Sequence, residues 1–186
     1  MSQRLIPFLA AAALSAGIWA CAAAGASAEP QKPTAPLHAV PHVELTSMAG
    51  RWYEVARSPN NIEHGCHAGG LEWTRTTDGF SVIQSCHKGA PDGPLSEWKA
   101  KAKVVDPSNA KFKMSFFGGL ISKEYWVLDQ RPDQGWLILA THDGEYLWLM
   151  SSKPVLPAAF RVEAVQRIKQ LGYDTGRLEF PLPGHG

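Results

Sequence analysis

The residues with the clearest potential for chemistry lie in two short segments that contain cysteine. One is His64-Gly65-Cys66-His67 and the other is Cys86-His87. Cysteine and histidine are preferred zinc ligands, so these side chains are a candidate metal site. However, two of the histidines directly follow their cysteines, which makes it difficult for all five side chains to converge on one ion. Two cysteines in an exported chain favour a disulfide, so we expect a Cys66–Cys86 bridge and no metal.

Glu54 is the other candidate, because it alternates with Trp52 and Ala56 on one face of a strand-like run. An inward carboxylate could transfer protons, but a hydrogen-bonded polar group inside the fold is the favoured interpretation. The sequence has no Gly-x-Ser-x-Gly nucleophile motif, no glycine-rich phosphate loop and no His-Glu-x-x-His motif. We therefore predict no catalytic residues and no enzyme activity.

Composition narrows the class of protein further. The chain has 186 residues, enough for one domain with a sizeable core, and a formal net charge of +1. That balance gives no basic surplus, so we expect no nucleic-acid partner. Seven Trp and seven Phe residues suit a packed or ligand-filled interior.

The N-terminal segment predicts export. Arg4 precedes an apolar run over 5–20, and Ala26-Ser27-Ala28 offers a cleavage site, so residues 1–28 are a predicted signal peptide. A second interpretation starts from Ile18-Trp19-Ala20-Cys21, which is similar to a bacterial lipoprotein box apart from its Trp. In that case the signal covers residues 1–20, and a lipid on Cys21 attaches the protein to a membrane. A transmembrane anchor is disfavoured because the run is short and interrupted by Pro7.

Residues 29–42 contain four prolines and are predicted to form an extended linker. Beyond it, alternating polarity predicts antiparallel strands. The clearest run, over 97–105, alternates lysines with Trp98, Ala100, Ala102 and Val104. Such a strand buries one face and exposes the other, as a barrel wall requires. The small Ala100 and Ala102 are expected to leave room for a cavity.

The last three predicted strands, over 124–130, 136–142 and 146–152, are largely apolar on both faces and must also be covered from outside. An amphipathic helix between Pro157 and Gly172 is the predicted cover. Its apolar stripe consists of Phe160, Ala164, Ile168 and Leu171. A short ninth strand is predicted over 177–180.

The segment Gly50-Arg51-Trp52, followed by Tyr-Glu-Val-Ala-Arg, resembles the first signature of the lipocalins, and in particular of their bacterial outer-membrane branch. Asp129 lies where the second signature of that family has its Asp. Where the family has an Arg that packs over the signature Trp, this chain has Ser152, and either the neighbouring Lys153 or another cation is the expected substitute. The resemblance also supports the disulfide, since these bacterial lipocalins often carry cysteines at the two places.

The resemblance implies an all-β fold for residues 43–186. This fold is an eight-stranded antiparallel up-and-down barrel with a C-terminal helix packed outside and a short ninth strand. It implies binding, storage or transport of a small lipophilic ligand, such as a fatty acid or lysophospholipid, in the periplasm or at the outer membrane. The ligand would enter between the loops 59–63, 89–94 and 118–123, past a rim of Phe117, Leu120 and Ile121. No cofactor is expected, and the oligomeric state is open.

The predicted ligand-binding residues are the inward-facing positions of the strands, together with Glu54. They are Glu54, Ala56, Trp73, Trp98, Ala100, Ala102, Phe112, Met114, Phe116, Tyr125 and Trp148. Three alternatives remain. An isomerase or de-epoxidase on the same barrel requires a free thiol or a titrating group in the lumen. A haem or tetrapyrrole carrier requires a ligating His such as His87. A structural envelope lipoprotein requires a filled cavity.

Overall fold

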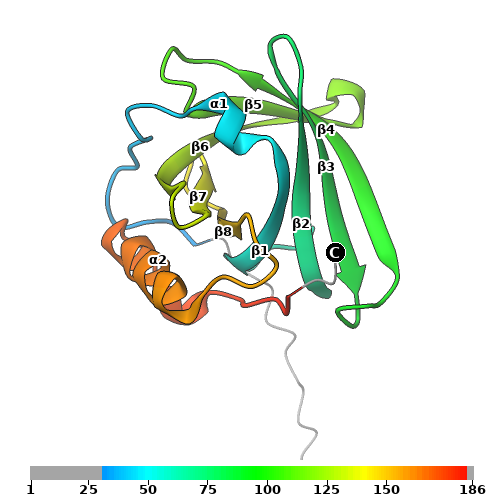
Figure 1. Ribbon diagram of the computed structural model, residues 1–186, viewed down its shortest axis with the longest axis vertical. Coiled ribbons are helices and arrows are strands. Elements are labelled where there is room, and N and C mark those ends of the chain that lie inside the picture. Colours follow the sequence, from blue (N-terminus) through cyan, green and yellow to red (C-terminus); the bar gives the residue numbers. More distant parts are fainter. Residues whose placement is uncertain (1–30, 184–186) are drawn as a thin grey trace, which may run out of the picture.

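The computed structural model describes residues 31–183, whose strands form one closed antiparallel barrel (Figure 1). Each strand pairs with the next in the sequence, and β1 pairs with β8 to close the ring. The strands are β1 (Gly50–Arg57), β2 (Cys66–Arg75), β3 (Gly79–Lys88), β4 (Leu95–Val104), β5 (Lys111–Phe116), β6 (Ile121–Arg131), β7 (Trp136–Thr141) and β8 (Leu147–Ser151). The predicted eight-stranded barrel is therefore confirmed.

The short helix α1 (Leu45–Met48) lies across one end of the barrel and closes it. Gly50 follows at a φ of +101°, a conformation that favours glycine and turns the chain into β1. The indole Nε1 of the buried Trp52 donates to the carbonyl of Met48 at 3.0 Å and so joins α1 to the strand. Lys153 is exposed, and among residues 31–183 no cation lies over the Trp52 ring. Lys153 therefore does not take the place of the family Arg.

Aromatic rings fill the lumen near the closed end. Trp73 contacts Phe80 and Phe112 edge-on, with ring centroids 5.2 and 5.7 Å apart, a favourable geometry for aromatic pairs. Ala100 and Ala102 belong to the same buried cluster. Neither alanine is among the residues that line the two spaces inside the barrel.

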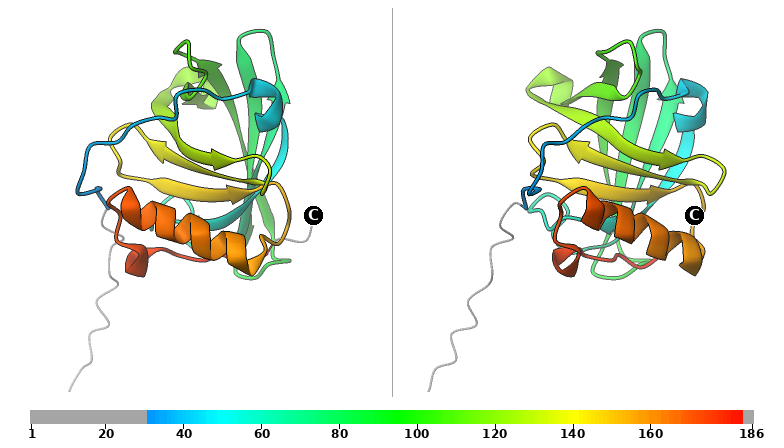
Figure 2. Two further views of the ribbon diagram at one scale, coloured as in Figure 1. Left: turned by 60° about the vertical axis from the view of Figure 1, so that its left-hand side comes forward. Right: turned by 90° about the vertical axis from the view of Figure 1, so that its left-hand side faces the viewer.

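A second core lies outside the barrel, between its wall and the helix α2 (Ala158–Gln170). Figure 2 shows α2 along the outer side of β7 and β8. Its Ala164 and Ile168 are fully buried against residues of both strands. Asp129 on β6 accepts a hydrogen bond from Arg167 Nε of α2 at 2.5 Å and one from Arg131 at 2.8 Å. The signature Asp thus attaches the helix to the wall.

A bulge in β1 between Glu54 and Ala56 interrupts the alternation of the strand. Glu54 faces the lumen, but Ala56 packs in the outer core, and Arg57 is buried. The assignment of Ala56 to the ligand site is therefore wrong. A bulge adds one residue to a strand, so each side chain beyond it points to the opposite face of the sheet from the one that alternation predicts.

Both ends of the described chain pack against the barrel. The segment 31–42 runs along its outside from α2 to α1 (Figure 2), with hydrogen bonds from Thr34 N to Gly172 O and from Val40 N to Val127 O. After the 3-10 turn Thr175–Arg177, the C-terminal segment meets β1 at a single bridge between Glu179 and Arg57. The expected ninth strand over 177–180 is thus reduced to one residue pair.

Candidate ligand-binding site

The open half of the barrel contains a cavity of about 280 Å³, which we call the chamber. A volume near 300 Å³ is at the lower end of the range for small-molecule sites. Six of its twelve lining residues are aromatic, and they come from four strands, the 3-10 turn after β5 and the β7–β8 loop. The lining residues are Asn60, Ile62, Glu63, Gln84, Trp98, Phe116, Phe117, Ile121, Lys123, Tyr125, Tyr146 and Trp148.

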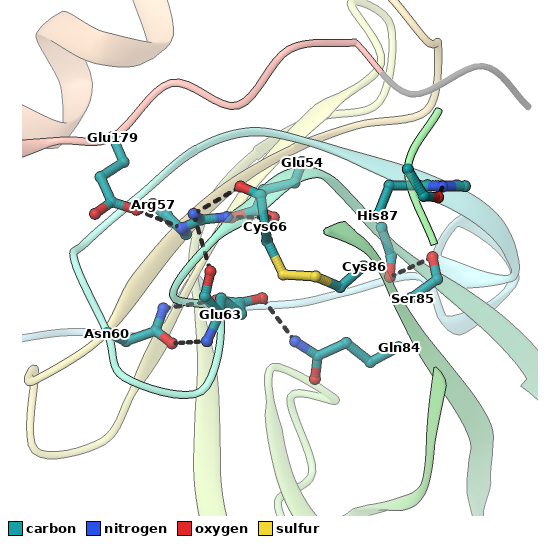
Figure 3. The surroundings of a disulfide bond; sticks show 12 residues. Glu54, Arg57, Asn60, Glu63, Cys66, Gln84, Ser85, Cys86, His87 and Glu179 are labelled. Atoms are coloured by element: carbon teal, nitrogen blue, oxygen red, sulfur yellow. Dashed lines mark hydrogen bonds and ion pairs between the residues drawn. A yellow bond between two sulfur atoms is a disulfide. The ribbon is translucent and has the colours of Figure 1, made fainter. Parts of the chain in front are cut away.

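The carboxylate of Glu63 forms the polar floor of the chamber. This side chain comes from the β1–β2 loop, and only 5% of the residue is exposed. Oε2 accepts hydrogen bonds from Asn60 Nδ2 at 2.6 Å and Trp148 Nε1 at 2.9 Å, and Oε1 accepts one from Gln84 Nε2 at 2.7 Å. Asn60 Oδ1 also accepts from the backbone N of Glu63, so the loop fixes its own carboxylate (Figure 3).

Below the chamber lies an inner pocket of about 30 Å³, enough for roughly one water molecule. Four residues line both spaces: Glu63, Gln84, Tyr125 and Trp148. Glu54 borders the inner pocket, where Gly69 of β2 provides the space for its carboxylate. Burial and the nearby Glu63 raise the pKa of Glu54 to about 8, although Arg57 opposes the shift.

Arg57 connects this polar group to the outside of the barrel. Its Nη1 donates to Glu54 at 3.2 Å, and its Nε donates to Glu179 at 2.7 Å. Its Nη2 donates to the backbone carbonyls of Glu63 and Cys66 at 3.2 and 3.1 Å. Figure 3 shows the guanidinium between the two carboxylates. The side chain is therefore fully used in positioning the β1–β2 loop that carries Glu63.

The predicted disulfide is present and ties the same loop to the wall. Cys66 at the start of β2 is bonded to Cys86 near the end of β3, with their Cα atoms 5.4 Å apart. Both cysteines of the described chain are thus in the bridge, and neither offers a thiol to the lumen. Within residues 31–183, no group of three His, Cys, Asp or Glu side chains is arranged to hold a metal ion.

Apolar side chains surround the mouth of the chamber. Phe117, Leu120 and Ile121 are 59%, 88% and 54% exposed in and beside the 3-10 turn Phe117–Gly119, and Ile62 of the β1–β2 loop is also exposed. Lys123 is the cation at this mouth, and it binds Glu145 at 3.0 Å and Asp143 at 3.4 Å. In the described part of the chain, no helix is long and apolar enough to cross a membrane.

The structure separates the predicted ligand residues into three groups. Trp98, Phe116, Tyr125 and Trp148 line the chamber. Glu54 and Met114 line the inner pocket. The others lie in the two cores: Trp73, Ala100, Ala102 and Phe112 in the packed half of the lumen, and Ala56 outside the wall.

Sequence reasoning missed the polar floor of the chamber. Gln84 offered a signal, since it follows Phe80 and Val82 on the inward face of β3 and is the polar residue in an apolar series. Asn60 and Glu63 lie in a loop, where alternation gives no information about direction. Their spacing does suit a local bond between the Asn side chain and the backbone N of Glu63.

Comparison with known sequences agrees with this architecture. Residues 43–183 match the family model described as a lipocalin-like domain. The outer membrane lipoprotein Blc of Vibrio cholerae is 30% identical over 137 residues, which cover 73% of this chain and 80% of that protein. The Blc protein of Escherichia coli K12 is 26% identical over 180 residues, or 94% of this chain and 95% of that protein.

Solved structures show the same fold at lower sequence identity. Insecticyanin from the tobacco hornworm Manduca sexta superposes with a TM-score of 0.67 at 18% identity, covering 82% of this chain and 88% of that one. Lobster apocrustacyanin A1 gives a TM-score of 0.64 at 14% identity, covering 83% and 92%. This chain therefore belongs to the lipocalin family, as the matching family model, the closed barrel and the bacterial relatives together show.

Proposed function

We propose that this lipocalin binds, stores or transports a small lipophilic ligand, such as a fatty acid or lysophospholipid, in a bacterial cell envelope. The chamber carries the proposal, because it is a space of about 280 Å³ with six aromatic residues in its lining and an exposed apolar rim around it. Each methylene that moves from water into such a space contributes about 0.8 kcal/mol. An alkyl chain can therefore offset the cost of association, which is about 4–15 kcal/mol.

The site supports binding more than chemistry. A thiol-dependent isomerase needs a free cysteine in the lumen, whereas Cys66 and Cys86 are bonded to each other. The inner carboxylate of Glu54 is engaged by Arg57, as expected for a satisfied interior group. The bacterial relatives are named as outer membrane lipoproteins, which supports the cell envelope as the location.

Titration with a fluorescent fatty acid and a lysophospholipid tests this function directly. Trp98→Ala removes one wall of the chamber and should weaken binding about tenfold, since burying a large side chain contributes about 1.5–3 kcal/mol. Trp126 serves as a matched control, because it packs against the outer core instead of the chamber. Trp126→Ala should leave the affinity of the folded protein unchanged. Failure of the wild-type protein to bind either lipid contradicts the proposal.

Attachment through Cys21 is part of the same proposal, although this residue lies outside the described range. The intact mass of the protein from its own host distinguishes the two forms. A diacylglyceryl group on Cys21 indicates an anchored lipoprotein, whereas cleavage after Ala28 indicates a free periplasmic protein.

A further inference from the structure

The floor of the chamber is a buried carboxylate with no ion-pair partner. Glu63 is held by the side chains of Asn60, Gln84 and Trp148, all of them neutral donors. None of the ion pairs found within residues 31–183 involves Glu63. A desolvated negative charge without a counter-charge is costly, and a cation placed beside it reduces that cost.

Neighbouring cations form no ion pair with Glu63, although the charge of Arg57 acts on it at longer range. The guanidinium of Arg57 reaches only the backbone carbonyl of Glu63, and it already binds the carboxylates of Glu54 and Glu179. Lys123 at the mouth is bound to Asp143 and Glu145. Each of these two cations therefore binds two other acidic side chains, and neither is in direct contact with the carboxylate of Glu63.

The wall of the chamber also suits a cation. Trp148 lies beside Tyr125 and Tyr146, with ring centroids 5.7 and 6.2 Å apart. Trp98 and Phe116 contribute further rings to the same space. The faces of aromatic rings attract organic cations, and the attraction is larger when water is excluded. One carboxylate inside a group of rings is therefore suited to an ammonium group.

We propose that the chamber selects an amphiphile whose polar end is an ammonium group, which lies toward Glu63 while the apolar body lies between the aromatic rings and the rim. This inference rests on the proposed lipophilic-ligand function. It adds the chemical class of the polar group that the ligand carries. A fatty acid of equal chain length binds more weakly, because its carboxylate would meet Glu63 without a free cation to offset the repulsion.

Three probes with the same alkyl chain test the inference: dodecyltrimethylammonium, dodecanoate and dodecanol, each below its micelle concentration. Binding is measured by calorimetry and by tryptophan fluorescence. We expect the ammonium probe to bind about tenfold or more tightly than dodecanoate, with dodecanol between them. Equal or tighter binding of dodecanoate overturns the inference but leaves lipid binding intact. If none of the three probes binds, the proposed function itself fails.

Glu63→Gln identifies the group responsible, because it removes the charge and keeps the shape. The preference for ammonium should fall to about twofold or less, while the affinity for dodecanol stays within about twofold. Glu97→Gln is the matched control: it removes the same charge from an exposed position on β4 and should keep the full preference. A preference that persists in Glu63→Gln overturns the assignment. If this variant does not fold, the three wild-type affinities still decide the inference.

Discussion

The two halves of the lumen use similar residues for opposite purposes. Near the closed end, Trp73 meets Phe80 and Phe112 edge-on in a buried apolar cluster that includes Ala100 and Ala102. Near the open end, Trp98, Phe116 and Trp148 surround a chamber whose floor is a hydrogen-bonded carboxylate. An aromatic side chain therefore indicates an interior position but not whether the interior is filled. What distinguishes the halves is the polar floor, since a buried carboxylate must keep its partners and cannot be packed over by apolar groups.

Two phenylalanines on one strand give the largest expected difference between the halves. Phe112 is fully buried in the packed half, and Phe116 is half-buried at the chamber. Phe112→Ala should lower the free energy of unfolding by about 3–5 kcal/mol, because it opens a cavity in a close-packed core. Phe116→Ala should cost only about 1 kcal/mol. Urea unfolding measures both values.

Ligand affinity should change in the opposite order. Phe116→Ala should weaken binding, whereas folded Phe112→Ala protein should bind as the wild type does. Equal stability losses, or equal losses of affinity, would show that the two halves are not distinct.

The ion pair of Arg57 tests the role of buried charge in the open half. Above about pH 8, where Glu54 is ionised, Arg57→Ala should lower the free energy of unfolding by about 3–5 kcal/mol, because the carboxylate of Glu54 is left buried without its cation. Arg131 is a matched control, since it pairs with Asp129 but is 44% exposed. Arg131→Ala should cost at most about 1 kcal/mol. Comparable losses in the two variants would argue that burial of Arg57 is not what makes its pairs important.

The disulfide belongs to the open half and should affect that half selectively. Replacing both cysteines with serine should cost about 3 kcal/mol, the value expected for a bridge whose cysteines are 20 residues apart. Hydrogen exchange should become faster in the β1–β2 loop, because the bridge holds Cys66 in place and the backbone carbonyl of Cys66 accepts a hydrogen bond from Arg57. Strands around Trp73 and Phe112 should keep their protection. Faster exchange throughout the barrel would contradict this division.

Most of the barrel could be predicted because its strands follow simple alternation. The lysines on β4 mark the outer face, and Trp98 and Ala100 mark the inner one. The apolar strands and the stripe on α2 likewise predicted the outer core. The prediction failed at β1, where a single extra residue turned Ala56 outward and buried Arg57. No alternation pattern reports a bulge, because the reversal depends on pairing with β8.

The candidate site was predictable only in its aromatic part. Trp98, Phe116, Tyr125 and Trp148 follow from their positions on strands. The position of Glu63, by contrast, depends on contacts with residues far away in the sequence, including Gln84 and Trp148. The cavity itself reflects how rings from several strands meet, which one strand considered alone does not determine. Ala102 shows the same limitation, because it is buried in the apolar cluster and lines neither space inside the barrel.

The pH dependence that Glu54 contributes is spread over several pH units, at no more than about 1.4 kcal/mol per unit. Its pKa is 4.5 as an ordinary carboxyl and about 8 in the folded protein, mainly because of burial. Between these values the folded state binds more protons than the unfolded state, so the free energy of unfolding falls as the pH rises. The contribution is absent below pH 4.5, where both states are protonated, and it stops growing above about pH 8.

Urea unfolding of wild type and Glu54→Gln at several pH values isolates this contribution. Between about pH 5 and 8, stability of the wild type should fall more steeply, by at most about 1.4 kcal/mol per pH unit, because one proton is involved. Glu97→Gln removes an exposed carboxylate and should keep the wild-type slope. Parallel profiles for wild type and Glu54→Gln would show that Arg57 keeps Glu54 ionised, and the open half would then hold two permanent negative charges. A steeper wild-type profile would show that the inner pocket accepts a proton, whereas the buried residues clustered around Phe112 in the described chain are hydrophobic.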